Sequence, residues 1–253
     1  MLRYAALTRE LPKVITRLQS RGEKIIVDYA RENCDASDAG AVADMNRAVM
    51  RTLPAGSMCA LKISSFGGPD IAMEGIDVLA RHGKLHGIKV CIDAEDVVYP
   101  ELTYNILASH NTPDRAHVYK TYQMYRRKAM DELLEDIEHA HKDKVMLGAK
   151  LVRGAYLRTQ DGLFDNKHDV DHEYNKALAY ALVCPHVHTI VATHNERSLR
   201  YASKFDQARY VTAQLLGMGR PLGKVNYRYV AFGSLKELTP YLFRRLCERA
   251  SWN

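Results

Sequence analysis

Two lysines lie inside apolar stretches of this 253-residue chain, where a charged side chain is costly unless it is neutralised. Lys62 interrupts the run MCALKI, and Lys150 interrupts the run VMLGAKLV. A buried ammonium group needs an anion nearby. We expect that anion to be a bound substrate or cofactor; the alternative is a structural ion pair with an acid of the chain itself, Asp93 or Glu95.

Further polar side chains fall where short apolar runs end. They are Asp93, Glu95, Lys120, Arg153, Thr193, His194 and Asn195, with Tyr229 inside the last run. Near the C-terminus, Arg244 and Arg245 are adjacent in PYLFRRLCERA, and Glu248 lies one helical turn after Arg244. Surface salt bridges are the default for such a triplet. Because leucine and phenylalanine surround it, we expect at least one guanidinium to face inward, where an arginine pair can hold a carboxylate.

Eight short β-branched runs can position these side chains, and stretches long enough for a helix separate them. The runs are Lys24–Tyr29, Met58–Ile63, Ile88–Asp93, His117–Thr121, Val145–Val152, Thr189–Thr193, Tyr210–Gln214 and Tyr227–Ala231. Strands that alternate with helices pair in parallel. An open doubly wound sheet is the alternative, but no GxGxxG follows the first run. We predict a single-domain α/β protein, a (β/α)8 TIM barrel over residues 1–253, whose site lies where strands end.

The first 23 residues have helical apolar spacing and several arginines, as a mitochondrial presequence would. Leu11, Val14, Ile15 and Leu18 form one apolar stripe that ends before Gly22. We interpret residues 1–23 as an N-terminal packing helix of the domain. No apolar run approaches the length of a membrane span, and no secretion signal opens the chain.

Charge and histidine spacing exclude two other classes of function. The chain has 36 Lys+Arg against 30 Asp+Glu, a formal charge of +6, but its densest basic groups lie among apolar helix formers. We therefore predict no nucleic-acid partner. His186 and His188, and His168 and His172, have the spacing of metal ligands. The first pair lacks an acidic or cysteine companion and the second lies in a polar, Asp-rich loop, so we predict no metal site.

Seven short motifs resemble, in family order, those of the FAD-dependent proline dehydrogenases. They are LKIS (61–64), IDAE (92–95), TYQ (121–123), KLVRGAY (150–156), ATHNE (192–196), QLLGMG (214–219) and YLFRRLCE (241–248). With lysine at position 150, the KLVRGAY motif resembles that of the eukaryotic branch of the family. The resemblance implies a distorted (β/α)8 barrel that oxidises L-proline to Δ1-pyrroline-5-carboxylate, transfers a hydride to FAD and passes the electrons to a quinone.

The same resemblance assigns the site. Lys62, Arg244 and Arg245 would bind the substrate carboxylate. The substrate pocket would be lined by Tyr156, Tyr229, Tyr241 and Glu248, with Asp93 holding polar groups in place. Lys150 would stand near the flavin N5, and further FAD contacts would come from Ala94, Val152, Arg153, Gly154, Thr193 and His194. By the same resemblance, Tyr229 would favour proline over hydroxyproline as the substrate.

The resemblance also implies a subcellular location, and two alternative functions stay open. The eukaryotic branch implies the matrix face of the mitochondrial inner membrane, with peripheral membrane contact. One alternative function is a Schiff-base lyase barrel that uses Lys62 or Lys150. Another is a catalytically silent barrel that binds an amino acid or a partner protein.

Overall fold

The structure, a computed structural model, describes residues 4–154, 162–218 and 225–251. The strands are β1 (Ala5–Leu7), β2 (Lys24–Tyr29), β3 (Met58–Lys62), β4 (Lys89–Asp93), β5 (Val118–Gln123), β6 (Leu147–Val152), β7 (Val187–Ala192), β8 (Tyr210–Leu215) and β9 (Tyr227–Gly233). The α-helices are α1 (Leu11–Gln19), α2 (Ala39–Thr52), α3 (Pro69–His86), α4 (Pro100–His110), α5 (Ala129–Asp143), α6 (Lys167–Val183), α7 (Glu196–Ala202) and α8 (Leu235–Ser251).

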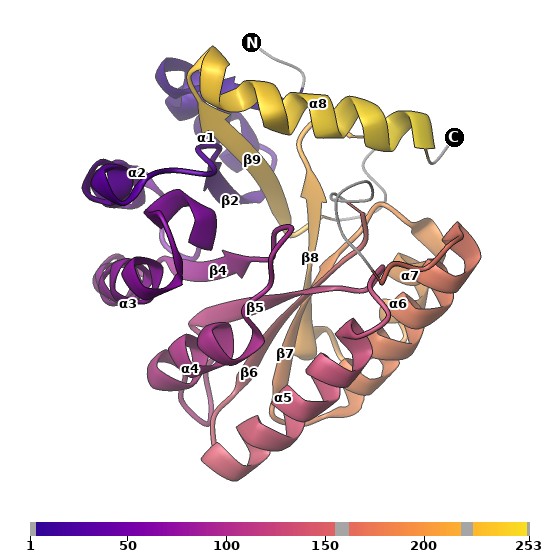
Figure 1. The fold of residues 1–253 in the computed structure, drawn as a ribbon. Helices are drawn as coiled ribbons and strands as arrows, with labels where there is room; N and C mark the ends of the chain where they lie inside the picture. The colour runs from indigo at the N-terminus through magenta and orange to yellow at the C-terminus, as the bar shows by residue number, and fades with distance from the viewer. Residues whose placement is uncertain (1–3, 155–161, 219–224, 252–253) are drawn as a thin grey trace. The chain divides into compact units, whose positions relative to one another are not determined.

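Strands and helices alternate along the chain (Figure 1), as the spacing of the apolar runs predicts. The strands pair in parallel, in the order β1-β9-β2-β3-β4 and then β5-β6-β7-β8. Each of the eight predicted runs corresponds to one of the strands β2 to β9, with ends shifted by no more than a few residues. The predicted (β/α)8 barrel is therefore confirmed.

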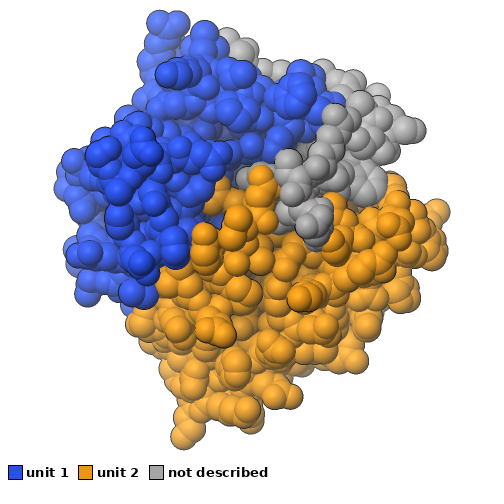
Figure 2. Space-filling view, in the orientation of Figure 1, with its two compact units in different colours: residues 1–93, 214–251, 253 blue, residues 94–213, 252 orange. Residues whose placement is uncertain are grey.

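The chain divides into two compact units (Figure 2). Unit 1 consists of residues 1–93, 214–251 and 253, and unit 2 consists of residues 94–213 and 252. Unit 1 holds β1 to β4 and β9 with the helices α1, α2, α3 and α8, and unit 2 holds β5 to β7 with α4 to α7. Unit 2 also holds the first residues of β8.

The first strand, β1, has no counterpart among the predicted runs. It contains only Ala5, Ala6 and Leu7, which pair with residues 231–233 of β9. Three residues without a β-branched side chain carry no strand signal, so the neighbouring strand decides their conformation. The helix that follows, α1, buries the stripe Leu11, Val14, Ile15 and Leu18 that the sequence indicates.

The other helices of unit 1 also cover its strands. The helices α2 and α3 contact each other, and α8 packs beside β9 (Figure 1). Of the helices in the described ranges, none is long and apolar enough to cross a membrane.

Candidate functional site

One face of the unit 1 strands carries four of the predicted site or neighbouring polar side chains. Lys62 of β3 stands in register with Asp93 of β4. Two residues earlier, Ala60 of β3 is in register with Asp28 of β2, which in turn is opposite Ala231 of β9. Residues in register, and residues two apart on one strand, share a face of the sheet. The same rule puts Tyr229, two residues before Ala231, on this face.

Lys62 is neutralised by an acid of the chain. Its side chain is almost fully buried, and its Nζ donates a hydrogen bond to Oδ1 of Asp28, which is 1% exposed. Glu32, which follows β2, brings Oε1 to 4.0 Å from the same nitrogen. Burial by itself lowers the pKa of Lys62, but the carboxylates of Asp28, Glu32 and Asp93 together raise it above its usual value. The ammonium form is therefore the stable one.

Asp93 and Tyr229 are joined directly. The Tyr229 hydroxyl donates to Oδ2 of Asp93 over 2.6 Å. Burial, with the nearby charges of Asp28 and Asp93, raises the pKa of Tyr229 well above its usual value. The phenol therefore stays protonated and holds the Asp93 carboxylate in one orientation.

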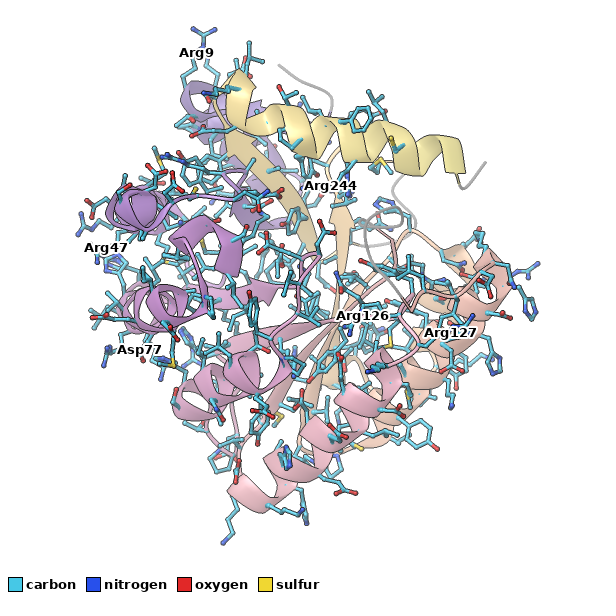
Figure 3. The ribbon with its side chains drawn as sticks, viewed as in Figure 1. Arg9, Arg47, Asp77, Arg126, Arg127 and Arg244 are labelled. Carbon is cyan, nitrogen blue, oxygen red and sulfur yellow. The ribbon has the colours of Figure 1, made fainter. Side chains whose placement is uncertain are left out.

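Helix α8 adds both arginines to this cluster. The guanidinium of Arg244 binds Glu32 in a bidentate ion pair, with Nη1–Oε2 and Nη2–Oε1 distances of 2.8 and 2.5 Å. Figure 3 shows Arg244 extending from α8. The guanidinium of Arg245, which is 6% exposed, lies 5.0 Å from the centre of the Tyr241 ring, and Tyr241 is close enough to Tyr229 to contribute to its pKa. Unit 1 thus brings together six of its seven predicted site residues; the side chain of the seventh, Glu248, lies outside the described set.

Unit 2 holds the residues assigned to the cofactor. Lys150 and Val152 belong to β6, and Lys150 is 5% exposed. Val152 is in register with Ala192, the last residue of β7. The segments that follow the two strands therefore start side by side, namely Arg153–Gly154 after β6 and Thr193–His194 after β7. Ala94 is the first residue of unit 2 and follows β4.

Arg153 is held by both neighbouring helices. Its guanidinium forms an ion pair with Asp171 of α6, donates from Nη2 to Ser198 of α7 over 2.7 Å, and lies 3.7 Å from the centre of the Tyr174 ring. Burial lowers the pKa of this arginine, against the opposing effect of Tyr174 and Asp171. Its Nε atom is buried with no hydrogen-bond partner among the described residues. Gly154, the next residue, has a φ of 82°, a conformation that favours glycine.

The prediction that Lys120 contributes to the site is wrong. Thr121, and not Lys120, is in register with Lys150, so Lys120 points to the opposite face of β5. Its Nζ lies 2.5 Å from Oδ2 of Asp136 in α5 and donates to the Pro100 carbonyl over 2.9 Å. Lys120 is thus a structural cation between a strand and its helices.

The expectation that guests neutralise the buried cations also needs correction. Lys62, Lys120, Arg153 and Arg244 each have a carboxylate of the chain as a partner. For Lys62 the partner is Asp28, rather than Asp93 or Glu95 as the alternative reading supposed. The sequence analysis missed Asp28 and Glu32. The signal was present, because Asp28 interrupts the apolar strand KIIVDY as Lys62 interrupts its own.

His186 and His188 contact different groups, the Ile137 carbonyl and the Tyr119 hydroxyl. Within residues 4–154, 162–218 and 225–251, no three His, Cys, Asp or Glu side chains are grouped to hold a metal ion. Tyr156 lies outside the described residues.

Comparison with known proteins places this arrangement in a family. The family model described as Proline dehydrogenase matches residues 11–252, nearly the whole chain. The chain belongs to the proline dehydrogenase family. The family expected from the sequence motifs is therefore confirmed.

Individual relatives and a solved structure agree with the family. The chain is 30% identical over 212 residues to proline dehydrogenase 1, mitochondrial, of Homo sapiens, and this alignment covers 71% of the chain and 35% of that protein. It is 32% identical over 208 residues to hydroxyproline dehydrogenase of Mus musculus, covering 68% of the chain and 46% of that protein. The structure of proline utilization A from Bdellovibrio bacteriovorus, inactivated by N-propargylglycine, superposes with a TM-score of 0.82 at 18% identity. It covers 98% of the chain and 32% of that structure. This proline dehydrogenase family chain thus spans a third to a half of these relatives.

Proposed function

We propose that the chain is a flavoenzyme that oxidises L-proline to Δ1-pyrroline-5-carboxylate, the first step of proline catabolism. One observation carries the proposal. The family match over residues 11–252 coincides with a unit 1 cluster that gathers Lys62, Asp93, Tyr229, Tyr241 and both arginines. The family supplies the reaction class, and the cluster supplies a site for a small zwitterion.

The residues assigned to FAD include the cations and N–H donors that its pyrophosphate and flavin would need. Arg153 keeps a buried Nε–H that makes no hydrogen bond within the described structure, Gly154 has a backbone conformation that favours glycine, and Lys150 is a cation in an apolar strand. Cations and exposed backbone N–H groups are the donors that a pyrophosphate needs. When bound, FAD supplies the hydride acceptor and passes the electrons on, which we propose is to a quinone.

The residues of the chain would bind and orient the substrate. Lys62, Arg244 and Arg245 bring positive charge to this cluster, and together they would bind the substrate carboxylate. The hydrogen bond between Tyr229 and Asp93 fixes the orientation of both side chains, which would line one side of the substrate pocket. With its carboxylate bound by the cations and its ring against these side chains, the substrate would be oriented for loss of the hydride from the ring carbon.

Among the substrates of the relatives, we propose proline over hydroxyproline. A hydroxyproline dehydrogenase is among the similar proteins, so the family alone does not select between the two imino acids. In this chain the Tyr229 hydroxyl is committed to Asp93 and buried. A ring hydroxyl placed against it would have to displace that bond or remain without a partner, which costs about 1–3 kcal/mol.

The first test is spectroscopic. Purified protein should show the absorption of oxidised flavin, either as isolated or after reconstitution with FAD. Anaerobic L-proline should bleach the band, hydroxyproline should do so less efficiently, and a dye acceptor should restore it. N-propargylglycine, which inactivated the similar Bdellovibrio protein, should abolish turnover. A protein that takes up no FAD would refute the proposal.

A substitution tests the assigned carboxylate contact. Arg245→Met should raise KM for proline by roughly 10- to 100-fold while the flavin spectrum stays unchanged, because a charged hydrogen bond is worth about 1.5–3 kcal/mol. Arg81→Met is the matched control, since that arginine pairs with Asp77 on the surface of α3. An unchanged KM in Arg245→Met would remove Arg245 from the site.

One observation argues against a Schiff-base role for Lys62. A Schiff-base lyase needs a lysine with a depressed pKa, whereas the neighbouring carboxylates raise the pKa of Lys62. The silent barrel predicts flavin-free binding of proline analogues, and turnover with a dye acceptor would exclude it. The proposal also includes a mitochondrial location and peripheral membrane contact.

A further inference from the structure

We propose that Asp28 is a positioning residue that keeps Lys62 charged and aimed for the substrate carboxylate. This inference rests on the proposed function for the identity of the ligand. The role assigned to Asp28 follows from contacts inside unit 1.

The strand register places Asp28 beneath Lys62. Asp28 is in register with Ala60, two residues before Lys62, and with Ala231 on its other side. Both flanking side chains are methyl groups, which leave room for the long stem of Lys62 to fold back to Oδ1 of Asp28. A larger residue at either position would compete for that space. The sheet therefore fixes where the ammonium group stands.

Burial makes the lysine depend on this acid. Lys62 is 4% exposed, so water contributes little to keeping it protonated. In such surroundings an isolated ammonium group loses its proton easily, and a nearby carboxylate reverses that tendency. Among the charged neighbours of Lys62, Asp28 has the largest effect on its pKa, ahead of Glu32 and Asp93.

The other titratable groups around the pair do not replace Asp28. They come from every strand and helix that contributes to the cluster, and they are Glu32 after β2, Cys59 of β3, Cys91 and Asp93 of β4, Tyr229 of β9, and Tyr241, Arg244 and Arg245 of α8. Glu32 is engaged by Arg244, and Asp93 by Tyr229. Burial raises the pKa of Cys59 and of Tyr229, so both stay neutral at physiological pH. Asp28 is thus the acid that holds Lys62.

The experiment compares Asp28→Asn with the unaltered protein. Asparagine keeps an oxygen that can accept the Lys62 hydrogen bond, but it removes the charge. In protein labelled with ¹³C and ¹⁵N at lysine, with the Lys62 signal assigned by its loss in Lys62→Arg, the Lys62 pKa should fall by about 1–3 units in Asp28→Asn. Glu138→Gln, which alters the exposed pair with Lys142, is the matched control and should leave Lys62 unchanged.

Binding of L-tetrahydro-2-furoate provides the functional readout. This analogue has the carboxylate of proline but no amine, so its own titration does not interfere. Calorimetry should show little change in Kd with pH for the unaltered protein in the alkaline range. In Asp28→Asn, Kd should rise by up to about tenfold per pH unit once Lys62 loses its proton. Asp28→Asn with Lys62→Arg should restore a flat profile, because a guanidinium does not titrate there.

The two measurements separate two kinds of failure. An unaltered protein that does not bind the analogue overturns the proposed function and the ligand assigned to Lys62, whereas the lysine signal still reports whether Asp28 holds the charge. An unchanged Lys62 pKa in Asp28→Asn overturns the role of Asp28. Tighter binding in Asp28→Asn at every pH would mean that Asp28 competes with the ligand, and it also overturns the proposal.

Discussion

Substitution of Lys120 tests whether this buried cation has a structural role or belongs to the substrate site. Lys120 and Asp136 are 4% and 5% exposed, and their charged atoms lie 2.5 Å apart. Lys120→Met removes the ammonium group and leaves the Asp136 carboxylate buried. The hydroxyl of Tyr122, 2.6 Å from Oδ2 of Asp136, still donates to it.

The expected magnitude follows from that geometry. Breaking a buried ion pair from one side costs about 3–5 kcal/mol, and the remaining hydrogen bond from Tyr122 places the loss near the lower end, about 3 kcal/mol. A domain has only about 5–15 kcal/mol of stability in total, so the effect is large. Asp136→Asn in the same protein should recover part of the loss, because it removes the unpaired charge, with a coupling of about 2 kcal/mol.

Urea unfolding followed by circular dichroism measures these differences. Lys142→Met is the control, because its pair with Glu138 is exposed and the substitution should change stability by less than about 0.5 kcal/mol. The KM of Lys120→Met for proline should stay unchanged at a temperature where the protein is folded. A loss of stability below about 1 kcal/mol, together with a raised KM, would refute the structural assignment and return Lys120 to the site.

Two further predictions concern packing and pH. Gly148→Ala should destabilise the protein by about 3 kcal/mol, because a Cβ there would lie 2.4 Å from the Val118 carbonyl oxygen, whereas Gly40→Ala in α2 meets nothing within 4 Å and should be neutral or stabilising in thermal unfolding. Glu237 anchors the start of α8; burial raises its pKa, but hydrogen bonds from Tyr29 and Ser234 bring it below its usual value. A lowered folded-state pKa gives stability that is present above the unfolded value of about 4.3 and is lost as the pH falls. Glu237→Gln should therefore lose less unfolding free energy on acidification than the unaltered protein, and equal losses would contradict this account.

The sequence by itself determined the fold class and the family. Eight apolar runs separated by helical stretches led to a parallel barrel, since period and spacing are local properties of the chain. Seven motifs in family order led to the proline dehydrogenase family. Each motif is a contiguous segment of the chain, so it can be recognised without the structure. The ends of strands were also predictable, and most of the proposed site residues fall there.

Only the tertiary structure determined which charged side chains form ion pairs with one another. Lys62 and Asp28 are 34 residues apart, and their contact depends on the register between β2 and β3. Register also turned Lys120 away from the face that bears Lys150, since a shift of one residue reverses every side chain of a strand. The short strand β1 has no strand signal of its own, and it is extended because its residues pair with residues 231–233 of β9. The local pattern marks Asp28 as a charge in an apolar strand, but a single chain segment carries no information about its neighbour's register. The pairing of Lys62 with Asp28 could therefore not be predicted from the sequence.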